Sequence, residues 1–326
     1  MAFGFAQPTS GLIADRLLLP DRHRRFVMDF ARAYADDVTV VVGSSASFIM
    51  QAQAHAAWIR ERYPEVAVVP VVADATSFRM NDTPIAAPWQ DTIALSLGSR
   101  RFDLLFAADA GDHTLAERVG AHFVPCFPSA ALSHAPAGVP GENAPRAPTA
   151  RPPKRVCLFG PESTGKSTLA TQLATRYRAV HVPEYVRDYL DTIGSAGTVA
   201  DVPWIARGQR AAEIAGAAQA DRLLICDTNL ATIALWSEVL FGATPNWIRD
   251  QAARDAYDLW LLTDIDVPFA ADPQRCFPEP ERRAWFMGEC EKTLDRLGVA
   301  PVLLRGPLDV RLARACAAID RMLAQS

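Results

Sequence analysis

The sequence lacks several features that would place the protein in a specialised class. Its 326 residues include six scattered cysteines with no C-x-x-C pair, so neither a zinc site nor a disulfide framework is expected. No apolar run approaches the roughly 20 residues that a membrane helix needs, and the first residues have no basic region ahead of an apolar core. With a net charge of −4 and no long block of Lys and Arg, sequence-independent nucleic-acid binding is not expected. These absences favour a cytoplasmic protein that acts on small molecules.

The composition is typical of a globular protein, with 50% hydrophobic and 21% charged residues. A length of 326 residues suggests two domains of ordinary size. Residues 131–153 are rich in Pro, Ala and Gly and show no apolar period, which predicts an extended linker. We therefore expect a first domain at residues 1–130 and a second at residues 154–326.

Short apolar runs alternate with helical patterns in both predicted domains. The runs expected to form strands are 38–42, 66–72, 102–107 and 122–125 in the first domain, and 156–159, 179–183, 222–226, 258–263 and 302–304 in the second. A chain that alternates strands and helices in this way builds a parallel sheet with helices on both faces. The predicted fold class is therefore α/β, with two doubly wound parallel-sheet domains.

The most specific motif lies at residues 160–167, where GPESTGKS fits the pattern G-x-x-x-x-G-K-[ST]. An apolar run precedes it and a helical pattern follows, which is the context that a phosphate-binding loop requires. Successive N–H groups at a helix N-terminus point at negative charge, so such a loop binds phosphates. Lys166 is expected to contact the β- and γ-phosphates, and the Ser167 hydroxyl to ligate Mg²⁺. The residues expected to bind ATP are Gly160, Pro161, Glu162, Ser163, Thr164, Gly165, Lys166, Ser167 and Thr168.

Two acidic residues follow predicted strands at the sheet edge where ligands bind in this fold class. Asp227 ends the apolar run LLIC and is expected to hold Mg²⁺; the alternative is an N-cap of the next helix. Glu184 is suited to accept a proton from an acceptor hydroxyl; the alternative is an acid that stabilises the first turn of a helix. Arg187 lies one helical turn further on, where it is suited to bind a phosphate or to pair with Glu184.

The segment 264–283 is charged and interrupted by prolines, which predicts a lid over the site. Its closure would bring Arg275 onto the transferring phosphoryl group; the alternative is a solvated charged loop. The guanine signature N-K-x-D is missing after the run 258–263, and no extra helical module typical of a motor ATPase is visible. The motifs therefore favour a small-molecule kinase over a GTPase or a motor protein.

Three stretches of the second domain, GPESTGKST, PEYVRDYL and ICDTNLATIALWSEVLFG, resemble the ribosylnicotinamide kinase domain of bifunctional NadR-type proteins. In that family a nicotinamide-nucleotide adenylyltransferase domain precedes the kinase, and DFARAYADDVTVVVGS and RFDLLFAADAG resemble its nucleotidyltransferase fold. The resemblance implies a kinase that uses ATP and Mg²⁺ to convert nicotinamide riboside to nicotinamide mononucleotide in NAD salvage. Asn229 stands where the family usually has an aspartate, and an amide binds a metal or a proton less strongly.

The first domain departs from the family in its active-site motifs. The family pattern G-x-F-x-P-P-H-x-G-H uses both histidines on the triphosphate, but here Asp21 and Arg24 occupy the histidine positions and His23 the glycine position. An aspartate repels phosphate, and the second family signature, I-S-x-T-x-I-R, is missing after residues 122–125. We therefore expect this domain to keep its fold and to have lost adenylyl transfer.

Two other functions stay open at this point. In a bifunctional enzyme, Arg16, Arg22 and Arg24 would replace the missing histidines. In a regulatory protein, the first domain would bind NAD or its precursors without turnover.

Overall fold

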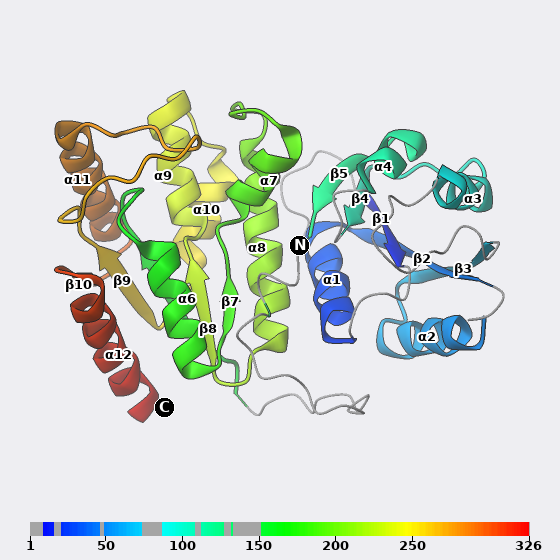
Figure 1. The fold of residues 1–326 in the computed structure, drawn as a ribbon, viewed down its shortest axis with the longest axis horizontal. Helices are drawn as coiled ribbons and strands as arrows, with labels where there is room; N and C mark the ends of the chain where they lie inside the picture. The colour runs from blue at the N-terminus through cyan, green and yellow to red at the C-terminus, as the bar shows by residue number, and fades with distance from the viewer. Residues whose placement is uncertain are drawn as a thin grey trace. The chain divides into compact units, whose positions relative to one another are not determined.

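The computed structural model describes residues 9–15, 21–45, 49–73, 87–107, 112–126, 132 and 151–325. The chain divides into two compact units, Met1–Pro128 and Ser129–Ser326, and each contains a five-stranded parallel sheet with flanking helices (Figure 1). Most of the predicted linker lies outside the described residues, as does Arg16. In the part of the chain that is described, no helix has the length and apolar character needed to cross a membrane.

The sheet of the first unit has the strand order β3-β2-β1-β4-β5. Its strands are β1 (Ser10–Asp15), β2 (Asp37–Ser45), β3 (Ala67–Ala73), β4 (Leu104–Ala107) and β5 (His122–Pro125), and its helices are α1 (Asp21–Tyr34), α2 (Ile49–Arg62), α3 (Ala87–Leu97) and α4 (His113–Val119). The β-branched run Val40, Val41 and Val42 is fully buried, because a parallel strand with helices over both faces has no exposed side.

The sheet of the second unit has the order β10-β9-β6-β8-β7. Its strands are β6 (Lys154–Phe159), β7 (Val180–Val182), β8 (Leu223–Asp227), β9 (Leu259–Thr263) and β10 (Val302–Leu304). Its helices are α6 (Lys166–Tyr177), α7 (Tyr185–Ile193), α8 (Val202–Gln219), α9 (Leu230–Phe241), α10 (Asn246–Arg254), α11 (Pro280–Arg296) and α12 (Leu308–Ala324). The central strand β6 pairs with β8 on one side and β9 on the other, so its carboxyl end is the topological switch point where such sheets bind ligands.

Alternate residues of β6 enter two separate cores. Val156 and Leu158 pack with α6 and α12, whereas Cys157 and Phe159 pack with α8, α9, α10 and α11. This alternation follows from the period of two along a strand and anchors β6 from both faces. The predicted fold class is therefore confirmed. The segment predicted as a lid is shorter than expected: α11 begins at Pro280, so the irregular part covers residues 264–279.

Two helical glycines with opposite surroundings test this packing. A Cβ added at Gly208 in α8 would lie 1.9 Å from Cε1 of Tyr185, whereas one added at Gly288 in α11 would meet no atom within 4 Å. We expect Gly208→Ala to lower the free energy of unfolding by about 1–3 kcal/mol through overpacking. Gly288→Ala should raise it by about 0.5–1 kcal/mol, because alanine is the better helix former. Urea and thermal unfolding of the full chain measure both variants, and a stable Gly208→Ala protein would contradict the contact between α7 and α8.

Candidate active site

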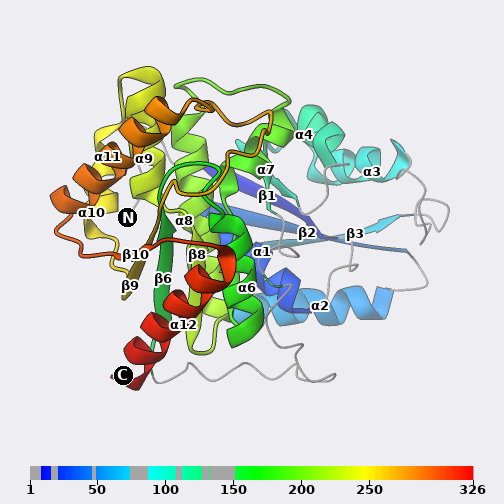
Figure 2. The ribbon, with the colours of Figure 1, turned by 60° about the vertical axis from the view of Figure 1, so that its left-hand side comes forward.

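The loop between β6 and α6 forms one wall of the candidate active site. Figure 2 shows this loop between the end of β6 and the start of α6. Gly160 has a φ of +133°, and a Cβ there would lie 2.7 Å from both the backbone oxygen and Oγ1 of Thr263. Gly165 has a φ of +81° and is the N-cap of α6. Both glycines of the motif are thus required by the backbone: the first for close approach to β9, and the second for a left-handed turn into the helix.

Lys166 lies inside this loop. Its Nζ donates hydrogen bonds to the carbonyl oxygens of Gly160 at 3.0 Å and Pro161 at 2.7 Å. Thr164 Oγ1 also donates to the Pro161 oxygen, at 2.7 Å, and shares a hydrogen bond of 2.7 Å with Thr263 Oγ1. Hydrogen bonds within the loop and to β9 therefore fix its conformation, and the Lys166 ammonium is bound to the loop's own carbonyl oxygens.

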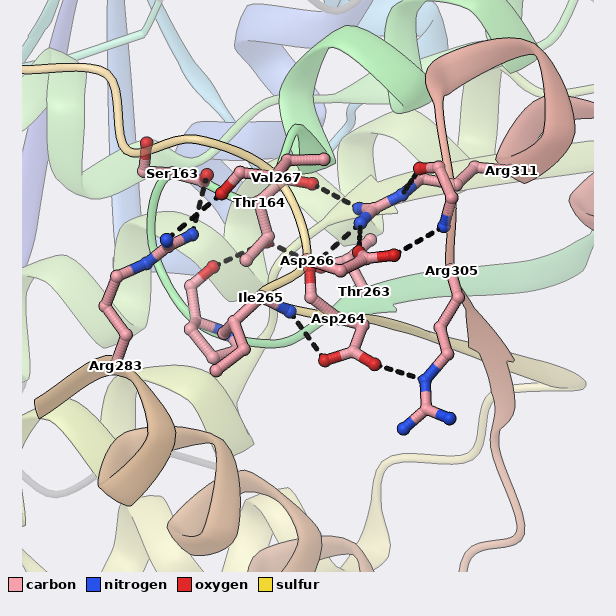
Figure 3. Close-up of polar contacts among 12 residues, drawn as sticks. Ser163, Thr164, Thr263, Asp264, Ile265, Asp266, Val267, Arg283, Arg305 and Arg311 are labelled. Carbon is pink, nitrogen blue, oxygen red and sulfur yellow. Dashed lines mark hydrogen bonds and ion pairs between the residues drawn. The ribbon is translucent and has the colours of Figure 1, made fainter. Parts of the chain in front are cut away.

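A buried arginine of α12 holds the outer side of the loop (Figure 3). The Arg311 side chain is 3% exposed, and its guanidinium binds groups from three loops: the oxygens of Thr164 at 2.8 Å, Gly306 at 2.7 Å and Asp264 at 3.1 Å, and the carboxylate of Asp266. Because a buried guanidinium needs a partner for each of its N–H groups, these contacts fix the loop against the residues that follow β9 and β10. Sequence reasoning missed Arg311, which stands in an ordinary helical pattern.

Arg283 of α11 also binds the phosphate loop, with fewer hydrogen bonds than Arg311 (Figure 3). It donates to the carbonyl oxygen of Val267 at 3.0 Å and to that of Ser163 at 3.5 Å. Arg283 stands at the end of the segment predicted as a lid, but it lies in the first turns of α11. Its contact with the phosphate loop is not visible in any local pattern.

Asp227 ends β8 beside the loop. Its side chain is buried, it accepts a hydrogen bond from Ser167, and its Oδ1 has no hydrogen-bond partner among the described residues. Burial raises the pKa of the Asp227 carboxyl, and the nearby charge of Lys166 opposes that rise. Asp227 is not the N-cap of α9, because Asn229 has that role: its Oδ1 accepts from Thr232 N at 3.0 Å.

Ser167 and Asp227 fit a divalent cation. An unpartnered carboxylate oxygen that is fully buried is a ready ligand for a hard cation, and the adjoining hydroxyl supplies a second oxygen. The described residues contain no group of three or more His, Cys, Asp and Glu side chains that could hold a metal alone. This donor set matches Mg²⁺, which keeps several waters and takes further ligands from phosphates.

Glu184 is the N-cap residue of α7, and its side chain makes no capping hydrogen bond with the backbone N–H groups of that helix. Its carboxylate accepts from Arg187 Nε at 3.2 Å, and the other side of that guanidinium donates to Asp272 Oδ2 at 3.1 Å. Burial and the negative charge of Asp227 raise the pKa of Glu184, against the opposing charges of Lys166 and Arg187. The structure thus brings the two carboxylates and the lysine into electrostatic contact.

The 264–279 segment lies against the phosphate loop. Glu162 Oε1 accepts from the backbone N–H groups of Cys276 at 2.8 Å and Phe277 at 2.5 Å. Ser163 Oγ accepts from Ala270 N at 2.7 Å and from Arg275 at 3.3 Å. Arg275 is therefore placed beside the loop, and the segment is bonded to the loop at several points.

These elements enclose a cavity of about 630 Å³. The phosphate loop, Glu184, Arg187 and Arg275 line one part of it, and the loop 194–198 lines another. Apolar side chains of α9, among them Trp236, form a further wall, and Trp236 stacks on Phe277 with ring centroids 5.4 Å apart. The cavity therefore joins a phosphate-binding part to a part suited to a flat apolar group.

The residues at the altered motif of the first unit lie at the start of α1. Arg22, His23 and Arg24 are half-buried in its first turn, and the side chain of Asp21 lies outside the described residues. Burial and the charge of Arg22 lower the pKa of His23, so this imidazole is neutral at pH 7. A neutral imidazole attracts phosphate less than a charged one.

Comparison with known proteins finds one matching family model and several similar solved structures. Residues 155–311 match a family model described as an AAA domain. A NadR protein in complex with NR is similar over 98% of this chain and 97% of its own length, with 15% identity and a TM-score of 0.46. A NadR protein in complex with NAD and AMP-PNP is similar over 98% of this chain and 97% of its own length, with 16% identity and a TM-score of 0.44. A shikimate kinase from Aquifex aeolicus is similar over 51% of this chain and 96% of its own length, with 17% identity and a TM-score of 0.32. No curated protein matches the sequence.

The family match contains the phosphate loop, Glu184 and Asp227. The family match therefore defines the second unit as a nucleotide-binding domain of the P-loop class. The conformations of Gly160 and Gly165, the hydrogen bonds of Lys166 to the loop and the strand order agree with this class.

The raised pKa of Asp227 predicts an effect on stability. A carboxyl whose pKa is higher in the folded than in the unfolded protein lowers the free energy of unfolding at every pH above the pKa that it has in the unfolded protein, which is about 4 for an aspartate. We therefore expect Asp227→Asn to raise the melting temperature of the ligand-free protein at pH 7, with a gain that shrinks as the pH falls toward 4. Asp250→Asn, an exposed change on α10, is the control. Scanning calorimetry between pH 4 and 8 measures both, and a destabilised Asp227→Asn protein would contradict the unpartnered oxygen.

Proposed function

We propose that the second unit transfers the γ-phosphoryl group of ATP to a hydroxyl group of a small molecule. The observation that carries this proposal is the placement of Glu184 and Arg187 in the same cavity as the phosphate loop, with Asp227 in contact with Ser167 behind it. A protein that only binds or hydrolyses ATP has no need of a roomy apolar compartment beside the loop. The 630 Å³ cavity supplies one.

Each residue has a distinct role in this reaction. The N–H groups of residues 160–168 bind the phosphates, and Lys166 exchanges its loop carbonyls for the β- and γ-phosphate oxygens. Ser167 and Asp227 would hold Mg²⁺, which neutralises charge on the phosphate oxygens when bound. Arg275 stabilises the transferring group from the 264–279 segment.

Glu184 is proposed as the general base. The acceptor oxygen forms a bond to the γ-phosphorus as the bond to the bridging oxygen of ADP breaks, and the hydroxyl proton passes to the Glu184 carboxylate. Its raised pKa makes it a better proton acceptor than an ordinary glutamate. Arg187 orients this carboxylate and is suited to move onto a phosphate oxygen.

We further propose that the acceptor is the 5′-hydroxyl of nicotinamide riboside, which gives nicotinamide mononucleotide. The identity of the acceptor rests on the resemblance of the motif stretches to ribosylnicotinamide kinases. The charges of the cavity support it. Outside the phosphate loop, the charged lining residues are Glu184, Asp191, Arg187 and Arg275. Arg187 is paired with Glu184 and Asp272, and Arg275 lies at the loop, where it donates to Ser163. Such a compartment favours a cationic or neutral acceptor with a flat ring over an anionic one.

For the first unit we propose a retained fold without adenylyl transfer. The neutral His23 and the aspartate at position 21 are poorly suited to bind a triphosphate. A bifunctional enzyme and a non-catalytic sensor of NAD precursors are the two alternatives that the following experiment distinguishes.

A single time course tests the acceptor and the first unit together. The full chain is incubated with Mg-ATP and nicotinamide riboside, and nicotinamide mononucleotide, NAD and ADP are quantified by chromatography. We expect the mononucleotide to accumulate with one ADP for each product and without NAD. Formation of NAD would show that the first unit is active, and ADP release without either product would reject the riboside as acceptor. Binding of NAD to the chain without turnover would favour the sensor.

Two substitutions test the assigned roles. Lys166→Ala should abolish transfer, because it removes the positive charge that lies within the loop against the Gly160 and Pro161 carbonyl oxygens. Glu184→Gln should lower kcat by about 10²–10⁴-fold, the usual contribution of a general base, while the affinity for ATP is kept. Steady-state kinetics and a fluorescent-nucleotide titration measure the two effects, with the exposed Glu291→Gln of α11 as control. Unchanged turnover in Glu184→Gln would remove Glu184 from the mechanism.

A further inference from the structure

A row of buried polar side chains connects β6 to the start of α7. Arg155 of β6 pairs with Glu213 of α8, and the Tyr257 hydroxyl donates to the same carboxylate at 2.7 Å. Gln209, one helical turn before Glu213, donates from Nε2 to Glu213 Oε1 at 3.3 Å. The Gln209 Oε1 then accepts from the backbone N–H of Tyr185 at 3.0 Å. Gln209 is 1% exposed and Glu213 is 4% exposed, so water does not replace these contacts.

The partners of Gln209 fix the orientation of its amide. A carboxylate only accepts hydrogen bonds, so the NH₂ group must face Glu213. A backbone N–H only donates, so the amide oxygen must face Tyr185. Arg155 and Tyr257 hold the Glu213 carboxylate in turn, because both donate to Oε2 and leave Oε1 for Gln209. The Gln209 side chain therefore cannot be turned round without losing both bonds.

The contact with Tyr185 determines where α7 begins. The first N–H groups of a helix have no partner within the helix, and Gln209 supplies one for the first residue of α7. The neighbouring Gly208 lets the Tyr185 ring lie against α8, where a Cβ would be 1.9 Å from Cε1. Glu184 is joined to Tyr185 by one peptide bond and makes no capping bond with its own side chain. Its position therefore depends on how Tyr185 is held.

We propose that Gln209 is a positioning residue for Glu184: by binding the N–H of Tyr185 it holds the Glu184 carboxylate at the phosphate loop. This inference rests on the proposed role of Glu184 as the base. Gln209 takes its own orientation from Glu213, so α8 supports the base from the side of the sheet opposite to Arg311. A displacement of about 1 Å at a catalytic group costs up to about 100-fold in rate.

Gln209→Met tests the proposal, because methionine has a similar length and neither donates nor accepts as an amide does. We expect kcat with nicotinamide riboside to fall by about 10–100-fold, while KM for ATP and KM for the riboside each change by less than about threefold. Gln251→Met on α10 is the matched control: it loses a hydrogen bond of 2.8 Å to Asp255 and does not line the cavity. Its kcat should equal that of the wild-type protein.

Gln209→Glu combined with Glu213→Gln is the second variant, which keeps an oxygen for the Tyr185 N–H and one donor between positions 209 and 213, so that no two carboxylates face each other. It should retain at least about ten times the kcat of Gln209→Met. Equal losses in the two variants would overturn the proposal, because the contact with Tyr185 would then not matter. A raised KM for the riboside with an unchanged kcat would also overturn it, since Gln209 would then contact the acceptor directly.

Crystal structures of the wild-type and Gln209→Met proteins separate this inference from the choice of acceptor. We expect the Glu184 carboxylate to shift by about 1 Å or more relative to the phosphate loop, while Lys166 and Ser167 stay in place. An unmoved Glu184 would overturn the positioning role even if the protein phosphorylates nicotinamide riboside. A shifted Glu184 in a protein without that activity would instead leave the positioning role in place and reject the acceptor.

Discussion

The second unit depends on a buried negative charge at the carboxyl end of β8. Asp227 has one oxygen without a hydrogen-bond partner, and an unsatisfied acceptor of this kind costs about 1–3 kcal/mol in a folded protein. The nearby charge of Lys166 and the hydroxyl of Ser167 offset part of that cost. The loop, the lysine and the strand end thus form one electrostatic unit, in which Lys166 and Ser167 lower the cost of burying the Asp227 carboxylate. A divalent cation would complete this unit.

Two separate parts of the scaffold hold the groups around this charge. On the side of β9 and β10, Arg311 donates to the carbonyl oxygen of Thr164 and Arg283 to that of Ser163. On the side of β7, the backbone N–H of Tyr185 donates to Gln209 Oε1, and we propose that this bond holds the start of α7 and with it Glu184. In both parts a buried side chain, Arg311 or Gln209, has several hydrogen-bond partners that fix its own orientation. Such contacts keep the geometry of a site in the absence of a ligand.

The sequence predicts the site only where a role is encoded locally. The motif identifies Lys166 and Ser167 because the loop's glycines and its lysine lie within eight residues, and Asp227 is found because it ends an apolar run. Arg311 and Gln209 escape this reasoning. The bond from Arg311 to Thr164 spans 147 residues and that from Gln209 to Tyr185 spans 24, so neither leaves a local pattern. Nine of the ten strands in the described part of the chain are predicted to within a few residues, because alternation and apolar runs are also local; β1 is not predicted as a strand. The contacts of Arg311 and Gln209 depend on tertiary packing.

Glu162 shows how the loop and the 264–279 segment are coupled. The motif places Glu162 among the ATP-binding residues, but its side chain points to the backbone N–H groups of Cys276 and Phe277. The neighbouring Ser163 bonds to Ala270 and Arg275, so two adjacent loop residues hold the segment at both ends. A shift of Ser163 on binding phosphate would therefore disturb its hydrogen bonds with Ala270 and Arg275. Because Phe277 also stacks on Trp236 in the apolar wall, the same segment connects the phosphate part of the cavity to the compartment proposed for the acceptor.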